Sequence, residues 1–158
     1  MKFSILNIKS LSGSKAQIYS IKYEEKYASE LKIFIDKFND SHTEIVNEAI
    51  QRIQLIAQKE GVQDSFFRRE CPKSHNVFRL LETKELRLYC IKLDSTILLF
   101  GYSGTKKFNK IKLKDNPSLQ QEVKTLQKIE DAIKERIKKG ELSITPEGLK
   151  GNLENLEI

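Results

Sequence analysis

The fold is decided by residues 76–102, which read NVFRLLETKELRLYCIKLDSTILLFGY. Three runs within this stretch are rich in leucine, β-branched and aromatic residues, a composition typical of β-strands. The connections between the runs are short, and Asp94-Ser95 is a two-residue link of the kind that closes a tight hairpin. We therefore expect an antiparallel meander of three strands, at 76–82, 86–93 and 96–102.

The register of this meander decides which side chains share a face of the sheet. A turn at Asp94-Ser95 would place Arg87 opposite Tyr102. The place of Arg79 depends on the preceding loop. A loop of three residues, 83–85, would put Arg79 on the same face as Arg87, opposite Tyr89, whereas a loop of two residues would turn it away. The face that carries Arg79, Arg87 and Tyr102 is the candidate working surface.

The residues before the meander predict two short extended segments and two helices. Residues 1–8 and 15–25 read as a hairpin, or as a loose arm that leads into a strand. Ser41 to Glu44 then has the pattern of a capping box at the start of a second helix, and Gly61 is suited to end that helix. Two stripes of apolar residues have helical spacing. They are Tyr27, Leu31, Phe34 and Phe38, followed by Val46, Ile50, Ile53 and Ala57.

A last helix closes the predicted fold. Asn116 is a suitable N-cap before Pro117, and an apolar stripe follows through Leu119, Val123, Leu126, Ile133 and Ile137. We expect this helix to pack on the sheet face opposite Arg79 and Arg87. Residues 141–158 are rich in turn formers and predict an extended or mobile tail.

These elements together predict an α+β fold with an antiparallel or mixed sheet. An N-terminal helical hairpin, the three-stranded meander and the closing helix form one domain over residues 1–140, in which 1–14 is an N-terminal arm or an extra strand. A chain of 158 residues is long enough to bury one core without staples.

Composition indicates a cytoplasmic protein without a metal or a cofactor. The two cysteines and two histidines do not have zinc-ligand spacing, and we expect free thiols in a reducing compartment. The chain shows no signal peptide and no apolar run long enough to span a membrane.

Positive charge is concentrated in one part of the chain. The net charge is +6, and residues 62–114 contain 12 Lys and Arg against 5 Asp and Glu, an excess of 12 − 5 = 7. A local basic field attracts polyanions, of which nucleic acid is the commonest. A solvated basic surface is the alternative, and charge by itself does not separate the two.

The order of the elements resembles the RelE/ParE superfamily of bacterial toxins, and most closely its branch of phage Gp49-like and HigB-like proteins. The resemblance covers 15–139 and rests on three segments. They are VFRLLE with Arg79, LRLYCIKL with Arg87, and ILLFGYSGTKKFNK with Tyr102, Lys106 and Lys107. The chain departs from the family pattern where Ser103-Gly104-Thr105 separates Tyr102 from the lysine pair, and at Phe108, where threonine is usual.

The resemblance implies a toxin of a type II toxin–antitoxin system that cleaves mRNA on the ribosome. In such enzymes the 2′-hydroxyl of the substrate attacks the phosphate, so the protein supplies charge and proton transfer. The implied partners are mRNA, the ribosome and a cognate antitoxin, and both a homodimer and a hetero-oligomer with the antitoxin stay open. Two alternatives also stay open, a ParE-like inhibitor of DNA gyrase and a phage-derived RNA- or protein-binding module without catalysis.

The site residues follow from that chemistry. Arg87 and Arg79 are the expected phosphate clamp, because the planar guanidinium can hold two phosphate oxygens. Lys106 and Lys107 either contact the phosphate or take part in proton transfer. His75 is a candidate for proton transfer because histidine titrates near neutral pH, although a histidine at a strand edge is more often structural.

Further residues are expected to contact RNA. Tyr102 would stack on a base, or pack against Tyr89 as an ordinary cross-strand neighbour. Phe66 and Phe67 are expected to close the edge of the core, and a contact with RNA is the alternative. The basic residues assigned to RNA binding are Arg68, Arg69, Lys73, Lys110 and Lys112.

Overall fold

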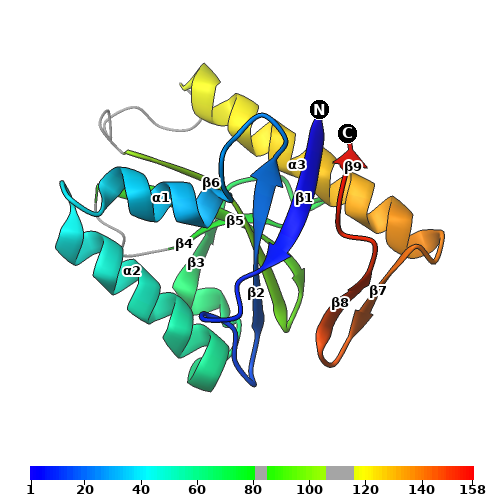
Figure 1. Cartoon of the computed structure of the whole chain (residues 1–158), viewed down its shortest axis with the longest axis horizontal. Coiled ribbons are helices and arrows are strands. Elements are labelled where there is room, and N and C mark those ends of the chain that lie inside the picture. The colour runs from blue at the N-terminus through cyan, green and yellow to red at the C-terminus, as the bar shows by residue number, and fades with distance from the viewer. Residues whose placement is uncertain (81–84, 106–115) are drawn as a thin grey trace.

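The computed structural model describes residues 1–80, 85–105 and 116–158. Its centre is a seven-stranded mixed sheet with the strand order β3-β4-β5-β6-β2-β1-β9, and only β2 and β6 run parallel (Figure 1). The α+β class predicted from the sequence is confirmed. The sheet strands are β1 (Lys2–Asn7), β2 (Gln17–Tyr23), β3 (Phe67–Arg69), β4 (Val77–Leu80), β5 (Leu86–Asp94), β6 (Ile97–Thr105) and β9 (Leu156–Glu157).

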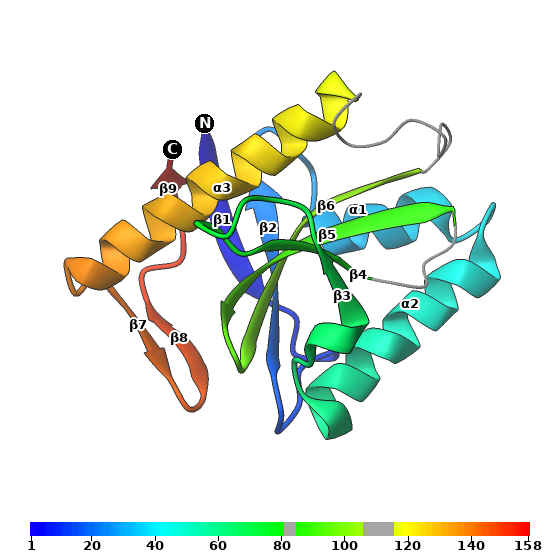
Figure 2. The same ribbon diagram turned by 180° about the vertical axis from the view of Figure 1, so that it is seen from behind.

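Helices cover both faces of this sheet. On one face lie α1 (Glu30–Phe38) and α2 (Thr43–Leu55), and on the other lies α3 (Pro117–Lys138) (Figures 1 and 2). A short π-helix at Ile56–Glu60 continues α2, and a single 3₁₀ turn at Asp64–Phe66 precedes β3. None of the helices in the described part of the chain is both long and apolar enough to cross a lipid bilayer.

The meander is present, with a register that differs from the predicted one. Arg79 lies opposite Tyr89, which confirms the alternative that puts Arg79 on the same face as Arg87. The pairing of Arg87 with Tyr102 is wrong, because Arg87 lies opposite Gly104 and Tyr102 lies opposite Tyr89. The turn occurs one residue later than expected, at 95–96, and one irregularity in β5 and one in β6 change the register twice more. Arg87 and Tyr102 still share a face, because Tyr102 pairs with Tyr89, which lies two positions from Arg87.

The turn is fixed locally by a side-chain hydrogen bond. The hydroxyl of Thr96 donates to the carboxylate of Asp94 at 2.9 Å, and Asp94 pairs with Ile97. Further along, Tyr89 pairs with Tyr102 whereas Cys90 pairs with Phe100, so Gly101 is the extra residue of a β-bulge.

The N-terminal hairpin is confirmed, and two helix details are corrected. β1 pairs antiparallel with β2, so residues 2–7 form an extra strand. Tyr27 is not part of the first stripe, since α1 begins after its cap Ser29 and Tyr27 is 70% exposed. The predicted capping box is also absent, because α2 begins one residue later than the box requires. His42 is the N-cap, and Ser41 Oγ lies 2.7 Å from His42 Nδ1.

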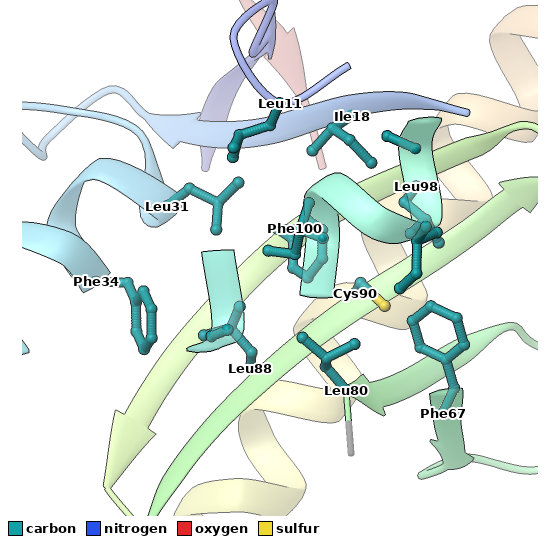
Figure 3. Packing of buried hydrophobic residues seen from close by; sticks show 14 of the residues in the cluster. Leu11, Ile18, Leu31, Phe34, Phe67, Leu80, Leu88, Cys90, Leu98 and Phe100 are labelled. Carbon is teal, nitrogen blue, oxygen red and sulfur yellow. The ribbon is translucent and has the colours of Figure 1, made fainter. Parts of the chain in front are cut away.

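Two hydrophobic cores result, one on each face of the sheet. The first lies under α1 and α2, where Leu31 and Phe34 meet Leu88 and Phe100 of the strands (Figure 3). Phe67 is buried in this core and Phe66 packs against it, so Phe67 closes the edge of the core as predicted. Ile18, Leu80, Cys90 and Leu98 complete the strand side of this packing.

The second core corrects the expected position of the closing helix. Leu126 and Ile129 of α3 pack with Tyr89 and Ile91, which alternate along β5 with the residues of the first core. Arg87 and Tyr89 are two positions apart and therefore share this face. The closing helix thus covers the same face as the arginines, rather than the opposite one.

Residues 141–158, for which we expected an extended or mobile tail, form three strands. β7 (Leu142–Thr145) and β8 (Gly148–Gly151) make a hairpin that buries Leu142 and Leu149 in the α3 core. The backbone N–H of Leu149 donates to the hydroxyl of Tyr19 at 2.9 Å. β9 then pairs with β1, and the two termini lie side by side (Figures 1 and 2). Leucines placed between the turn formers are what hold this segment to the core.

Candidate functional site

Three arginines gather on the α3 face of the sheet. Arg68 of β3 lies opposite Arg79 of β4, and Arg79 lies opposite Tyr89, the residue two positions beyond Arg87 in β5. Residues paired across strands point to the same side. Arg68 is exposed, but the side chain of Arg79 is only 14% exposed and Arg87 is 7% exposed. Adjacent strands therefore bring guanidinium groups together in a partly desolvated place.

Within the described residues, the positive charge of the three arginines is not balanced by paired carboxylates. Glu70 Oε1 lies 3.3 Å from Arg79 Nε, whereas Arg87 has no ion pair among these residues and donates from Nη1 to the hydroxyl of Tyr89 at 3.1 Å. The Nε atoms of Arg79 and Arg87 are both buried, and neither donates a hydrogen bond within the described part of the chain. Burial lowers the pKa of Arg79, and the charges of Arg87 and Arg68 lower it further, against the opposing effect of Glu70.

This group of partly buried arginines favours the binding of an anion. A buried charge is costly unless it is paired and hydrogen-bonded. An oxyanion would accept the hydrogen bonds that the Nε atoms do not make, and would offset the positive excess. We name Arg68, Glu70, Arg79 and Arg87 the arginine cluster.

Two stacked tyrosines lie beside the arginine cluster. The ring centroids of Tyr89 and Tyr102 are 5.5 Å apart and their planes are tilted by 31°. Tyr89 is fully buried and Tyr102 is partly buried. Packing against Tyr89 is therefore the role of Tyr102 that the structure shows, and base stacking stays a prediction. A Cβ added at Gly104 would collide with the Tyr102 hydroxyl, so the missing side chain lets this ring lie over the strand.

Two carboxylates that sequence reasoning missed, Glu122 and Glu30, act on Tyr102 through their charges. Glu122 of α3 is half-buried, and burial followed by the charge of Glu30 raises its pKa. Its own charge helps to raise the pKa of Tyr102 and of Tyr23. Glu30 is buried and accepts from Lys26 Nζ at 2.6 Å. The signal in the sequence was the place of Glu122 at the border of the apolar stripe of α3.

His75 is not part of this group. Its Nε2 lies 2.9 Å from Asp131 Oδ1, and its Nδ1 lies 3.0 Å from Ser74 Oγ. Arg79 is four residues further along the chain, which corresponds to roughly 13 Å in an extended strand. The adjacent Asn76 donates from its backbone N–H to the buried Glu130 at 2.7 Å. These contacts hold the loop before β4 against α3, a structural role.

The remaining predicted residues divide into three groups. Arg69 lies away from the cluster, with its guanidinium 4.7 Å from the Phe78 ring centroid and a hydrogen bond to the Pro72 carbonyl. Lys73 is exposed in the same loop as His75. The third group lies outside the described residues and consists of Lys106, Lys107, Lys110 and Lys112.

The structure thus brings together four of the predicted residues, Arg68, Arg79, Arg87 and Tyr102, and leaves His75, Arg69 and Lys73 elsewhere. Within residues 1–80, 85–105 and 116–158, no three His, Cys, Asp or Glu side chains are grouped as a metal site. Comparison with protein families, with characterised proteins and with solved structures finds no match to this chain.

Proposed function

We propose that this chain binds RNA by clamping a backbone phosphate between Arg79 and Arg87, and cleaves the strand there through the neighbouring 2′-hydroxyl. This is the activity implied by the resemblance to the RelE/ParE superfamily. The protein would act in the cytoplasm as the toxin of a type II toxin–antitoxin system, on mRNA held by the ribosome, with a cognate antitoxin as its inhibitor. The order of a helical pair, an arginine-bearing meander and a closing helix supports that assignment.

One observation carries the proposal, the positive excess of the arginine cluster in a partly buried place. A purely structural arginine pair would be expected to meet two carboxylates, whereas in the described residues Glu70 pairs with Arg79 and no carboxylate pairs with Arg87. A phosphate group supplies the missing negative charge and several acceptor oxygens. Arginine suits this ligand because its planar fork can donate two parallel hydrogen bonds to two oxygens.

The same charges would act on the reaction itself. When the 2′-oxygen attacks, negative charge builds up on the phosphate oxygens. Guanidinium groups that are already fixed by the sheet stabilise this charge without having to reorganise. Arg87 is the better fixed of the two, since it is 7% exposed and bonded to the buried Tyr89.

A second candidate function is an RNA-binding module without catalysis. The observation that favours it is the engagement of His75 with Asp131, away from the arginine cluster. A phosphate site without a proton acceptor would bind RNA and leave it intact. The two functions share the arginine cluster and differ only in turnover.

The test compares purified variants on programmed ribosomes. Arg87→Ala removes a fixed donor and should slow transcript cleavage by about 100- to 1,000-fold. Arg87→Lys keeps the charge without the fork, so an intermediate rate would identify geometry as the requirement. Arg136→Ala is the matched control, because Arg136 pairs with Glu141 beyond the site. Thermal melts show whether each variant is folded.

The outcomes separate the functions. Wild-type cleavage that Arg87→Ala leaves unchanged would place the active surface elsewhere. RNA binding without cleavage by the wild-type protein would select the binding module, and a DNA supercoiling defect with intact transcripts would select a gyrase inhibitor. A folded wild type that neither binds nor cuts RNA would refute the arginine cluster as a phosphate site.

A further inference from the structure

Tyr89 lies at the centre of the site, next to two members of the arginine cluster. Across the sheet it pairs with Arg79 on β4 and with Tyr102 on β6, and Arg87 precedes it by two positions on β5. Residues paired across strands, or two positions apart in one strand, point to the same side of a sheet. Tyr89 is fully buried, so the core around it holds its side chain in place. One fixed side chain is therefore adjacent to three predicted site residues.

The hydroxyl of Tyr89 holds Arg87 by one end of its guanidinium. Arg87 Nη1 donates to this hydroxyl at 3.1 Å, and both side chains are buried. Burial and the charge of Glu70 raise the pKa of Tyr89, against the opposing effect of Arg87, so the hydroxyl stays neutral. A carboxylate in this place would cancel the charge of the guanidinium. A neutral oxygen instead fixes the guanidinium and leaves its charge for a ligand.

The bond to Tyr89 also bears on which edge of Arg87 is free. A guanidinium can hold two oxygens at its end, through Nη1 and Nη2, or at its side, through Nε and Nη2. Tyr89 binds Nη1, which is one of the two atoms that the end-on mode needs. The Nε atom is buried and finds no hydrogen-bond acceptor within residues 1–80, 85–105 and 116–158. The side edge is thus the one that a phosphate can use with both of its donors.

The ring of Tyr89 also fixes the position of Tyr102 beside Arg87. The centroids of the two tyrosine rings are 5.5 Å apart. Gly104 lies opposite Arg87, and a Cβ added at Gly104 would collide with the Tyr102 hydroxyl. The hydroxyl end of Tyr102 therefore occupies the place of the side chain that would otherwise face Arg87. Tyr89 thus holds one residue by its hydroxyl and another by its ring.

We propose that Tyr89 is a positioning residue, which holds Arg87 by Nη1 so that Nε and Nη2 of the guanidinium face one phosphate group of the RNA. This inference rests on the proposed function. It names the edge of Arg87 that meets the phosphate, and it accounts for the buried Nε that finds no acceptor in the described part of the chain. Tyr89 acts through Arg87 rather than on the substrate, because its own side chain is fully buried.

Removal of a single oxygen atom tests the role of the hydroxyl. Tyr89→Phe keeps the ring and its stacking on Tyr102 but releases Arg87 Nη1. Cleavage of ribosome-bound mRNA should fall by about 100-fold, the loss expected when a group that contacts the substrate is misplaced by about 1 Å. Tyr19→Phe is the matched control and should leave the cleavage rate unchanged. Tyr19 is buried in the same core, and its hydroxyl accepts from the backbone N–H of Leu149 at 2.9 Å.

A double variant shows whether Tyr89 acts through Arg87. Tyr89→Phe should slow the wild-type protein by about 100-fold but should not slow Arg87→Ala further, because no guanidinium is left to orient. A side chain that only stabilised the core would lower the rate by the same factor in both backgrounds. Thermal melts of the single and double variants show that the rates compare folded proteins.

The wild-type protein supplies a spectroscopic signature that does not depend on the stability of any variant. Its ligand is an RNA that carries a 2′-O-methyl group at the scissile position, which cannot be cut. Binding should shift the NMR resonance of the Arg87 Nε–H group, because this group gains a phosphate acceptor. The resonance is assigned by its absence in Arg87→Lys. The Nε–H resonance of Arg136, which pairs with Glu141 outside the cluster, is the control.

The outcomes separate this inference from the proposed function. A Tyr89→Phe variant that cuts at the wild-type rate would overturn the inference and leave the proposed function in place. The same holds if Tyr89→Phe slows Arg87→Ala by the full factor, or if RNA binding does not move the Arg87 Nε–H resonance. A wild-type protein that neither binds nor cuts RNA would instead refute the phosphate clamp, and this inference with it.

Discussion

Substitutions at Gly101 and Leu126 test how closely α3 packs against the sheet. Gly101 is the extra residue of the bulge in β6, directly before Tyr102. A Cβ added at Gly101 would collide with Leu126 Cδ2 and would lie 2.7 Å from Ile21 Cδ1. Leu126 is fully buried, so a new methyl group at Gly101 would meet a side chain that is already packed in the core. The bulge that orients Tyr102 therefore depends on close contact between the strand and α3.

The magnitudes follow from packing. Gly101→Ala should destabilise the fold by about 1–3 kcal/mol, because a methyl group is forced into a filled core. Leu126→Ala should cost about 2–5 kcal/mol, as expected for a fully buried leucine. The double variant should cost less than the sum by roughly 0.5–3 kcal/mol, since removing Leu126 Cδ2 vacates part of the space that the new methyl group needs. The contact with Ile21 remains and keeps the relief incomplete.

Urea unfolding of the single and double variants measures this coupling. Ile53→Val, in the core on the other side of the sheet, serves as the control partner, and its effect should add to that of Gly101→Ala within about 0.5 kcal/mol. Strict additivity of Gly101→Ala and Leu126→Ala would refute the close contact. An unchanged melting temperature for Leu126→Ala would show that α3 does not pack on this face at all.

Two further predictions concern ionisation. The pKa of Glu122 is raised in the fold above its ordinary value of 4.5, so the stability that its protonated form contributes is complete below that value and is lost as pH rises through the folded pKa. Glu122→Gln should thus gain stability relative to wild type as pH rises above 4.5 in urea unfolding, and a constant difference would contradict this. Burial raises the pKa of the Cys90 thiol to about 12. A maleimide should label the partly exposed Cys71 in native protein and leave Cys90 unlabelled until unfolding, whereas equal labelling would show that the first core is open.

Several elements could be predicted because their signals are local. The runs rich in leucine, β-branched and aromatic residues at 86–93 and 96–102 predict strands, and the spacing of Leu119, Val123 and Leu126 predicts a helix. The structure confirms both, with β5, β6 and α3 at these places. The charge excess of 62–114 likewise follows from composition alone.

The starts of helices and the positions of turns were less predictable, because alternative positions one residue apart differ little in free energy. Ser41 and His42 are neighbours, and either could precede α2, but the structure begins the helix after His42. The turn between β5 and β6 could occur at either of two adjacent positions, and the hydrogen bond from Thr96 to Asp94 selects the later one. The later turn, together with the register shifts between Lys92 and Asp94 and between Tyr89 and Cys90, moved the partner of Arg87 from Tyr102 to Gly104.

In the candidate site, too, some features could be predicted from local sequence and others depended on tertiary packing. Arg79 and Arg87 could be assigned to one face, as one of two alternatives, because side chains alternate along a strand. Tyr102 shares that face in the structure because the bulge at Gly101 separates it from Phe100, which lies in the other core. The effect of the Glu122 charge on the pKa of Tyr102 could not be predicted, since the two residues lie far apart in sequence and the effect depends on the packing of α3. His75 was predicted from its chemistry alone, and its contact with Asp131 depends on the same packing.

The sequence by itself thus determined the strands of the meander, the helices α1 to α3 and the location of positive charge in this protein, because each depends on residues close together in the chain. Only the tertiary structure decided which helix covers which face. The physical reason lies in β5, where Leu88 and Cys90 are apolar on one side and Tyr89 and Ile91 are largely apolar on the other. A strand without a polar face must be buried on both sides, and its own pattern does not say which helix covers either. The packing of α3 on the arginine face therefore emerges only when the whole chain is assembled.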